Sequence, residues 1–506
     1  MHRGMGGLLL IALAACATAP GVVSTEAQSS RTSTVATTEP AEIPTEVTEP
    51  TTPVDTSPAA STTTVVGPLG RNDNGVGDLL FPSLGNPGID VEHYTLVLAY
   101  DRQRNEISAN AHLDLVMTED RVAFSLDSAG PIVSAVSVDG LPAKFVVAPP
   151  ELLITPVSQL ARGQRIGVDV TYSLPPQPVP SDAGQQVGWF RTPGGSYVLN
   201  EPEGAHTWLP CDDHPSDKAT FRFELTVPSG LTAVANGALI EHTSTATTDT
   251  WVWQEDRPMA TYMIQLLTGD YEIVDGVGPN GLPLLSVVLR EDRATMQAYL
   301  DTIDEQIDFF DDFFGSYPFD RYGIAITDSY PGLAMETMER SLFSRTDFAS
   351  GRLDLLQELL LSHELAHQWF GDAVSPSRWT DVWLSESFAT YGQWMWFEHL
   401  GLQTMADSAT AALAFRERGS TAAPTAAEMF GFNSYAGGAV ILHALRKTIG
   451  DDRFFSLLRR WVADNNGSSR TTDDFVALAN QVAGQDLTEF FTTWLYSDTL
   501  PRAFPG

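Results

Sequence analysis

Two kinds of hydrophobic periodicity divide the chain. Between residues 90 and 275, apolar and polar residues alternate over short segments that Gly, Pro, Asn and Asp interrupt at short intervals. Such alternation is typical of half-buried β-strands. The clearest segments cover residues 93–99, 109–116, 166–172 and 221–227. Together they predict an antiparallel β-sandwich or saddle.

Beyond this region the apolar positions recur every three to four residues, which is the period of an amphipathic helix. The pattern is found at residues 293–314, 353–370, 384–399, 438–449, 451–464 and 472–482. A β-rich half followed by a mainly helical half predicts an α+β protein with two domains. We place the β-saddle domain at residues 88–276 and the helical domain at residues 277–506.

The N-terminus has neither period. Residues 7–14 (GLLLIALA) follow Arg3 and form an apolar run that is too short to span a bilayer. The run ends in Leu13-Ala14-Ala15-Cys16, which resembles the bacterial lipobox, where a signal peptide is removed before a cysteine that then carries lipid. We predict a lipoprotein signal peptide at residues 1–16 and lipidation of Cys16. An ordinary secretory signal that is cut further on is the alternative.

Residues 17–82 are rich in Thr, Ser, Pro and Glu and lack periodic apolar positions. They are expected to form a disordered tether, because such a composition cannot build a core. The predicted location is extracytoplasmic, with the lipid anchored in the outer face of a bacterial cell membrane, or secreted if the signal is an ordinary one. No later segment has the run of about 20 apolar residues that a transmembrane helix needs.

The charge of the chain narrows the choice of partners. The formal net charge is -35, so the phosphates of nucleic acids would be repelled. A substrate with a positively charged N-terminus is favoured, although the acidity also serves solubility. The chain contains two cysteines, Cys16 and Cys211, and lipidation of Cys16 would leave no partner for an internal disulfide.

The candidate chemistry lies in the helix predicted at residues 353–370, which contains the motif H-E-x-x-H. His363 and His367 are four residues apart, so both imidazoles lie on one helix face and can bind one metal ion. Glu364 is rotated from His363 by about 100° around the axis, beside the metal rather than on it. A carboxylate in that place suits a general base acting on water.

A third ligand is predicted in the helix that follows. Glu386 lies 19 residues after His367 and is a lone carboxylate among apolar residues. Two histidines and one glutamate, with one position left open, form a recognised catalytic site for a single Zn²⁺ ion. The alternative is that Glu386 is an exposed helix acid and that the histidines are satisfied core groups.

These residues resemble the aminopeptidase N family of gluzincin metallopeptidases. The family signature is H-E-x-x-H, eighteen residues and a glutamate, and residues 363–372 (HELAHQWFGD) and 379–386 (WTDVWLSE) are similar to the segments around it. The resemblance runs from about residue 90 to the end and is most specific between residues 317 and 446. It implies a β-saddle domain followed by a thermolysin-like catalytic domain.

The resemblance also implies residues that bind the free amino group of a substrate. Family members carry Gly-x-Met-Glu-Asn on an edge strand, and residues 333–337 (LAMET) correspond to it with the first and last residues replaced. Glu336 is then the residue that binds the amine, and Ala334 and Met335 contact the substrate. A second acid of the family corresponds to Glu201, with the neighbouring Glu203 as the alternative.

The last implied residue is a donor to the developing oxyanion. The family uses a tyrosine about 50 residues beyond the glutamate ligand, and Tyr435 in Tyr-Ala-Gly-Gly-Ala fits this place. Cys211 resembles a packed family cysteine rather than a nucleophile, and His443 is interpreted as structural.

The resulting prediction is a zinc aminopeptidase that removes N-terminal residues from peptides and acts as a monomer. The alternatives are a thermolysin-like endopeptidase, an epoxide hydrolase and a non-catalytic peptide-binding surface protein. The sequence stops where the family's catalytic domain ends, at residues 490–500, so we expect an open cleft with weak limits on substrate length.

Overall fold

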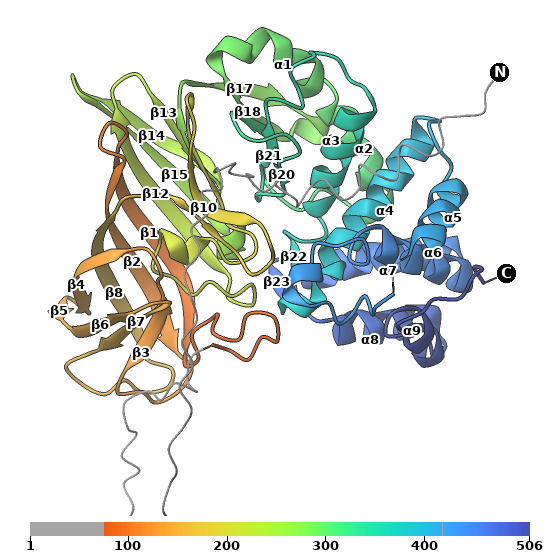
Figure 1. The fold of residues 1–506 in the computed structure, drawn as a ribbon, viewed down its shortest axis with the longest axis horizontal. Coiled ribbons are helices and arrows are strands. Elements are labelled where there is room, and N and C mark those ends of the chain that lie inside the picture. Colours follow the sequence, from red (N-terminus) through yellow and green to blue (C-terminus); the bar gives the residue numbers. More distant parts are fainter. Residues whose placement is uncertain (1–74, 417, 506) are drawn as a thin grey trace, which may run out of the picture. The chain divides into compact units, whose positions relative to one another are not determined.

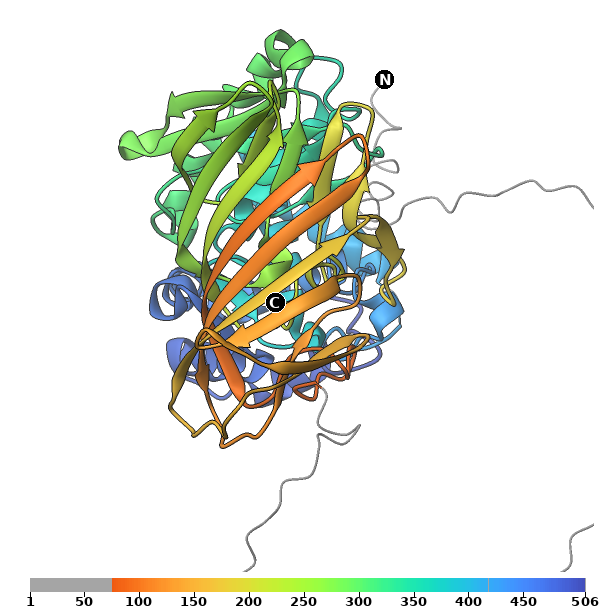
Figure 2. The ribbon, with the colours of Figure 1, turned by 90° about the vertical axis from the view of Figure 1, so that its left-hand side faces the viewer.

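The computed structural model describes residues 75–416 and 418–505. Its largest element is a twisted eight-stranded sheet, seen face-on in Figure 2. In spatial order its strands are β14 (Ala238–Ser244), β15 (Thr248–Met259), β12 (Ala219–Pro228), β1 (Ile89–Asp101), β2 (Glu106–Met117), β8 (Arg165–Leu174), β4 (Ile132–Val138) and β5 (Leu141–Pro142). Alternate residues of β12 are buried, as the period of two requires.

The pairing in this sheet corrects one part of the fold prediction. Strands β1 and β12 run parallel, with Tyr94 opposite Phe221, so the sheet is not antiparallel throughout. Parallel neighbours need a long crossover connection, and here more than one hundred residues separate the two strands. Local alternation identifies strands but carries no information about so distant a partner.

Two smaller sheets complete the β-rich half. The first consists of β13 (Thr232–Ala235), β16 (Leu266–Gly269), β11 (Gly195–Leu199), β10 (Gln186–Arg191) and β9 (Pro178–Pro180). The second consists of β3 (Phe124–Asp127), β7 (Glu151–Thr155) and β6 (Lys144–Ala148). The indole of Trp253 on β15 donates to the carbonyl oxygen of Ala233 on β13 at 3.0 Å and thereby joins the first of them to the large sheet.

A mixed five-stranded sheet begins the second half. Its order is β17 (Tyr271–Val277), β18 (Pro283–Leu289), β19 (Ile324–Thr327), β21 (Ser341–Ser344) and β20 (Ala334–Met335). The predicted boundary at 276/277 falls at the end of β17, whereas the pairing of β17 with β18 assigns residues 271–277 to this second sheet. Strand β20 lies at the edge of the sheet, as the resemblance implied for the segment that carries Glu336.

Helices form most of the remainder (Figure 1). They are α1 (Arg293–Leu300), α2 (Ile303–Phe314), α3 (Leu355–His367), α4 (Trp383–His399), α5 (Met405–Phe415), α6 (Ala436–Ile449), α7 (Asp451–Asn465), α8 (Thr472–Ala483) and α9 (Thr488–Trp494). The predicted helix 293–314 is divided near Asp301, and α5 and α9 were not predicted. Short 3-10 helices lie at Ala205–Thr207, Thr261–Met263, Pro279–Gly281, Arg290–Asp292, Trp379–Asp381 and Ala426–Glu428, and β22 (Val374–Pro376) pairs with β23 (Ser468–Arg470).

The start of the described chain corrects the end of the predicted tether. Residues 75–82 are attached to the fold through Asp78 and Phe81, which are only 3% and 4% exposed. The carboxylate of Asp78 accepts hydrogen bonds from the backbone N–H groups of Leu80 at 2.7 Å and of Trp379 at 2.8 Å. Leu80 is two residues from Asp78, whereas Trp379 is about 300 residues away in the sequence. The composition of the segment could not reveal so distant a partner. Cys16, the signal peptide and the tether up to residue 74 lie outside the described residues.

Candidate functional site

Helices α3 and α4 position the predicted metal ligands. Asp354 caps the N-terminus of α3 and forms a capping box with Gln357, which fixes where the helix begins. The H-E-x-x-H motif occupies the last turns of α3, and His363, Glu364 and His367 are at most 3% exposed. Glu386 lies in the first turn of α4, so the end of one helix faces the start of the next.

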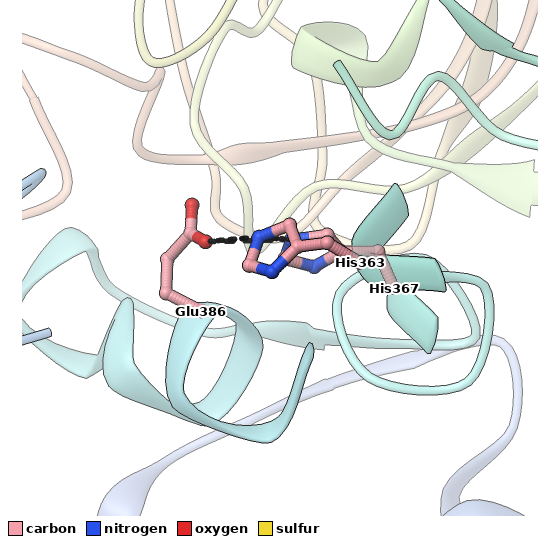
Figure 3. Close-up of side chains that lie close together, drawn as sticks. All are labelled: His363, His367 and Glu386. Carbon is pink, nitrogen blue, oxygen red and sulfur yellow. Dashed lines mark hydrogen bonds and ion pairs between the residues drawn. The ribbon is translucent and has the colours of Figure 1, made fainter. Parts of the chain in front are cut away.

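The three predicted ligands converge on one point (Figure 3). Nε2 of His363 and Nε2 of His367 each lie 3.3 Å from Oε2 of Glu386, and the two nitrogens are 3.1 Å apart. Ligands about 2.0–2.1 Å from a tetrahedral Zn²⁺ ion are separated by about 3.3 Å, so these spacings fit a zinc site. Two imidazole nitrogens at this distance would otherwise compete for one proton.

A hydrogen bond on the far side of the ring fixes the orientation of His367. Its Nδ1 lies 3.1 Å from the carbonyl oxygen of Phe370 and 2.9 Å from Oγ of Ser385. Donation from Nδ1 to the carbonyl leaves the lone pair of Nε2 directed at the centre of the triad. Gly371 makes this possible: it has φ +131°, and a Cβ there would lie 2.5 Å from Oγ of Ser385.

The electrostatics of the site call for a cation. Burial by itself would lower the pKa of His367, but the carboxylates of Glu336, Glu386 and Glu364 raise it to about 10. Burial would raise the pKa of Glu386, whereas His367 and His363 lower it to about 2. The pKa values of Glu336 and Glu364 are raised by burial. A divalent ion would balance this surplus of buried carboxylates, so the residues fit zinc by charge as well as by spacing.

Tyr435 lies beside the triad at the N-terminus of α6. Its hydroxyl donates to Oε1 of Glu386 at 2.9 Å, and its ring stacks over that of His363 with centroids 5.9 Å apart. A Cβ on Gly438 would lie only 1.7 Å from Oγ of Ser387, so the glycine of Tyr-x-x-Gly lets α6 pack closely against α4. This close packing brings the tyrosine to the ligands.

Glu336 follows the edge strand β20 and points toward helix α3, which carries His363, Glu364 and His367. One ligand atom each from Glu336, Glu364 and His367 lie within 4.8 Å of one another. Ala334 and Met335 are buried in β20, opposite Phe343 and Leu342 of β21. The structure thus brings Glu336 next to the predicted base.

Of the two candidate acids after β11, Glu201 faces this centre. Burial and then the carboxylates of Glu336, Glu386 and Glu364 raise the pKa of Glu201 well above its ordinary value. The carboxylate of Glu203 instead accepts hydrogen bonds from Oγ of Ser181 at 2.9 Å and from the backbone of Asp182 at 3.3 Å.

Cys211 and His443 stay apart from the site. Cys211 is completely buried, and burial raises the pKa of its thiol well above the ordinary value, which does not suit a nucleophile. The ring of His443 packs against Phe504 with centroids 5.0 Å apart, and burial lowers its pKa to about 4.

The sequence analysis missed several residues that support the site. Ser385 orients His367, and Gln368 donates to the carbonyl oxygen of Glu336 at 3.5 Å. Asp372 is fully buried, and its carbonyl oxygen accepts a hydrogen bond from Lys218 of the β-rich half at 2.9 Å. Ser385, Gln368 and Asp372 lie within residues 363–372 and 379–386, the segments that resemble the family, so their position in the sequence could have indicated a role near the site. Lys218 had no such signal.

Comparison with known proteins finds relatives of both halves of the chain. The Peptidase M1 N-terminal domain model matches residues 194–263, and the Peptidase family M1 domain model matches residues 298–494. Aminopeptidase M1-C of Oryza sativa subsp. japonica is 27% identical over 326 residues, which are 60% of this chain and 37% of that protein. Probable aminopeptidase 2 of Sulfurisphaera tokodaii is 25% identical over 446 residues, 82% of this chain and 54% of that protein. The chain therefore spans about half the length of these curated relatives, or less.

The similarity to solved structures extends further. An M1 zinc metallopeptidase from Deinococcus radiodurans, solved as a mutant with a Tyr-Ser-Ala substrate, has a TM-score of 0.78 and 31% identity. The match covers 86% of this chain and 100% of that one. A two-domain M1 zinc metallopeptidase mutant bound to L-tryptophan matches with the same TM-score and coverage at 30% identity. Since the match includes the whole of these structures, the chain belongs to peptidase family M1, a family of zinc metallopeptidases.

Proposed function

We propose that this protein is a zinc-dependent aminopeptidase, which hydrolyses the first peptide bond of substrates with a free N-terminus. The observation that carries the proposal is the placement of Glu336 within 4.8 Å of Glu364 and His367. An α-ammonium group and the carbonyl carbon of the same residue are only about 2.5 Å apart. An acid that holds the ammonium so close to the base therefore selects the first peptide bond.

His363, His367 and Glu386 would hold the zinc ion. Zinc, when bound, supplies a Lewis acid that makes water more acidic and a carbonyl group more electrophilic. Glu364 takes the proton of the attacking water on its carboxylate and returns it to the nitrogen of the leaving group. Burial raises the pKa of Glu364 well above its ordinary value. A general acid and base works best when its pKa is close to the pH of the reaction, so this rise suits a residue that must both take and return a proton.

Tyr435 is the proposed donor to the oxyanion. Its hydroxyl donates to Oε1 of Glu386 at 2.9 Å. Rotation about the side-chain torsions would redirect the hydroxyl to the oxygen of the tetrahedral intermediate, where a preorganised donor lowers the barrier.

Glu201 and Glu336 are the proposed amine-binding acids, and Ala334 and Met335 are proposed to contact the substrate. Glu201 is 8% exposed, and the charge of Glu336 contributes to the rise of its pKa, which supports placing both carboxylates around the same ammonium group. A peptide with a blocked N-terminus would leave these buried carboxylates without a counter-charge, which is costly.

The test compares aminoacyl-p-nitroanilides with their N-acetylated forms, with and without a chelator and after zinc is restored. We expect hydrolysis of the free forms only, abolished by the chelator and recovered with zinc. Equal rates on blocked and free substrates would instead identify a thermolysin-like endopeptidase. Activity that resists the chelator would contradict the zinc assignment.

We further propose that the protein acts as a monomer outside the cytoplasm, anchored by lipid at Cys16. Support comes from the apolar run that ends in Leu13-Ala14-Ala15-Cys16. Among the described residues, no helix is sufficiently long and apolar to cross a membrane. Cys16→Ser should move the protein from the membrane fraction to the medium, and an unchanged distribution would rule out the lipid anchor.

A further inference from the structure

The carboxylate of Glu336 depends on its backbone for its position. Within residues 75–416 and 418–505, Oε1 of Glu336 has no hydrogen-bond partner, although the residue is only 3% exposed. Among these residues, no hydrogen bond therefore holds this oxygen in place. Its location is set by the turn that joins β20 to β21, residues 336–340, which we name the Glu336 loop.

A glutamine from the β-rich half holds this loop. Nε2 of Gln265, which precedes β16, donates to Oγ1 of Thr337 and to the carbonyl oxygen of Arg340, both at 2.8 Å. The hydroxyl of Thr337 donates in turn to the carbonyl oxygen of Arg340 at 2.5 Å. Gln265 is 1% exposed and Thr337 2% exposed, so water does not compete for these hydrogen bonds.

Three further hydrogen bonds, two from Arg340 and one from Asn236, attach the loop to the β-rich half. Nη1 of Arg340 donates to Oε1 of Gln265 at 2.8 Å and to the carbonyl oxygen of Ala235 at 2.9 Å. Nδ2 of Asn236 donates to the carbonyl oxygen of Met338 at 3.0 Å. All five loop residues thus have hydrogen-bond partners outside the loop, and Gln368 is the partner of both Glu336 and Glu339.

The opposite side of the loop is attached to Gln368, the residue that follows helix α3. Oε1 of Gln368, the residue after His367, accepts a hydrogen bond from the backbone N–H of Glu339 at 2.9 Å. Glu339 has φ +66°, a left-handed conformation that a non-glycine residue keeps only when its surroundings enforce it. The loop therefore lies between Gln265 on one side and the end of α3 on the other.

We propose that Gln265 and Thr337 are positioning residues that set the distance from Glu336 to the metal triad and so determine the preference for a free N-terminus. The inference rests on the proposed aminopeptidase function. It also accounts for Thr337, which replaces the asparagine of the family pattern: its hydroxyl accepts from Gln265 and donates within the loop. Amine recognition in this chain then depends on a contact between the β-rich half and the catalytic half.

The test uses one disruptive and one conservative variant of the same residue. Thr337→Val keeps the size of the side chain and removes both hydrogen bonds, whereas Thr337→Ser keeps the hydroxyl. Gln265→Glu is an independent variant, because it retains the acceptor for Arg340 and loses the two donated hydrogen bonds. Thermal unfolding and zinc content of each variant are measured first, so that only folded, zinc-loaded proteins are compared.

Two inhibitors that differ by one amino group separate amine binding from metal binding. Glycine hydroxamate carries the amine, and acetohydroxamate lacks it. For Thr337→Val and Gln265→Glu we expect the inhibition constant of glycine hydroxamate to rise about tenfold, with that of acetohydroxamate within about twofold of wild type. Thr337→Ser should behave as wild type. Both disruptive variants remove the hydrogen bond between Gln265 and Thr337, and each removes one further hydrogen bond to the carbonyl oxygen of Arg340, so the effect of the double variant should be smaller than the sum of the two single effects.

The possible outcomes are distinct. A parallel rise for both inhibitors, or no change in either, would overturn the positioning role while the wild type still prefers free over N-acetylated substrates. A wild type that binds both hydroxamates equally and cleaves blocked and free substrates alike would overturn the aminopeptidase function and this inference together.

Discussion

The proposed metal triad and the proposed amine-binding acids are built in different ways, although both lie in one site. His363, His367 and Glu386 come from two consecutive helices within 24 residues, and the buried faces of α3 and α4 fix their relative positions. Glu336 comes from a loop after an edge strand, and Glu201 follows β11 in a different sheet. The triad is a local structure, while amine recognition requires the β-rich and helical halves to pack correctly.

Because the two groups of residues lie on different elements, hydrolysis of the peptide bond and selection of the substrate should respond to different substitutions. Changes at the contact between the halves should alter which peptides bind before they alter hydrolysis itself. Changes within α3 or α4 should remove hydrolysis for every substrate. The predictions below test this division, from the largest expected effect to the smallest.

Removal of a ligand should abolish both activity and zinc binding. His367→Ala deletes one of three ligands and leaves the carboxylates without the cation that balances them. We expect activity below detection. Zinc at about a thousandfold excess over its Kd should add about 4 kcal/mol to the free energy of unfolding of the wild type and nothing to that of the variant. Thermal unfolding with and without zinc, together with metal analysis, measures this, and a variant that still binds zinc tightly would refute the ligand assignment.

Glu364→Gln should remove the base and preserve the metal site. The amide has the same shape but cannot take a proton, so kcat should fall by about a thousandfold. Zinc content and KM should stay close to wild type, because Glu364 is not one of the three converging ligands. Steady-state kinetics and metal analysis measure both, and a drop in zinc content parallel to that in kcat would show a ligand role instead.

The two parts of the site were not equally predictable from the sequence. The spacing of His363 and His367 follows from helix geometry, and Glu386 was predicted as a lone carboxylate among apolar residues at the place of the family signature, so the triad could be proposed without a structure. The resemblance favoured Glu201 over Glu203, but the sequence could not show that Ser181 binds the carboxylate of Glu203, or that the charge of Glu336 raises the pKa of Glu201. Gln265 gave no signal, because its partner Thr337 is 72 residues away in another sheet.

The fold shows the same limit. Helices α3 and α4 begin and end within about three residues of the predicted ranges, because apolar periodicity and caps are local features. Helix α5 (MADSATAALAF) was missed because small residues fill both its faces and weaken the period. The parallel neighbour of β1 and the packed segment at residues 75–82 depend on contacts across the chain, which local patterns do not contain.

Tyr435→Phe should have an intermediate effect. Loss of one oxyanion donor typically lowers kcat by about a hundredfold or more. The hydroxyl also donates to Glu386, so a purely orienting role would weaken zinc binding. Measuring kcat and zinc affinity on the same preparation separates the two roles. A weaker zinc Kd with unchanged kcat at saturating zinc would contradict the oxyanion assignment.

The smallest effect is expected at Glu201, the acid from the β-rich half. Glu201→Gln keeps the size of the side chain and removes one of two charges facing the ammonium group, so KM for free N-termini should rise about tenfold with kcat changed less. Glu203→Gln is the matched control two residues away, since its carboxylate is bound to Ser181 and Asp182 and should leave KM within about twofold of wild type. If the control raised KM as much as Glu201→Gln did, local damage after β11 would explain both effects. Amine recognition would then belong to Glu336 alone, and the β-rich half would contribute to specificity only through the contacts of Gln265 and Asn236 with the Glu336 loop.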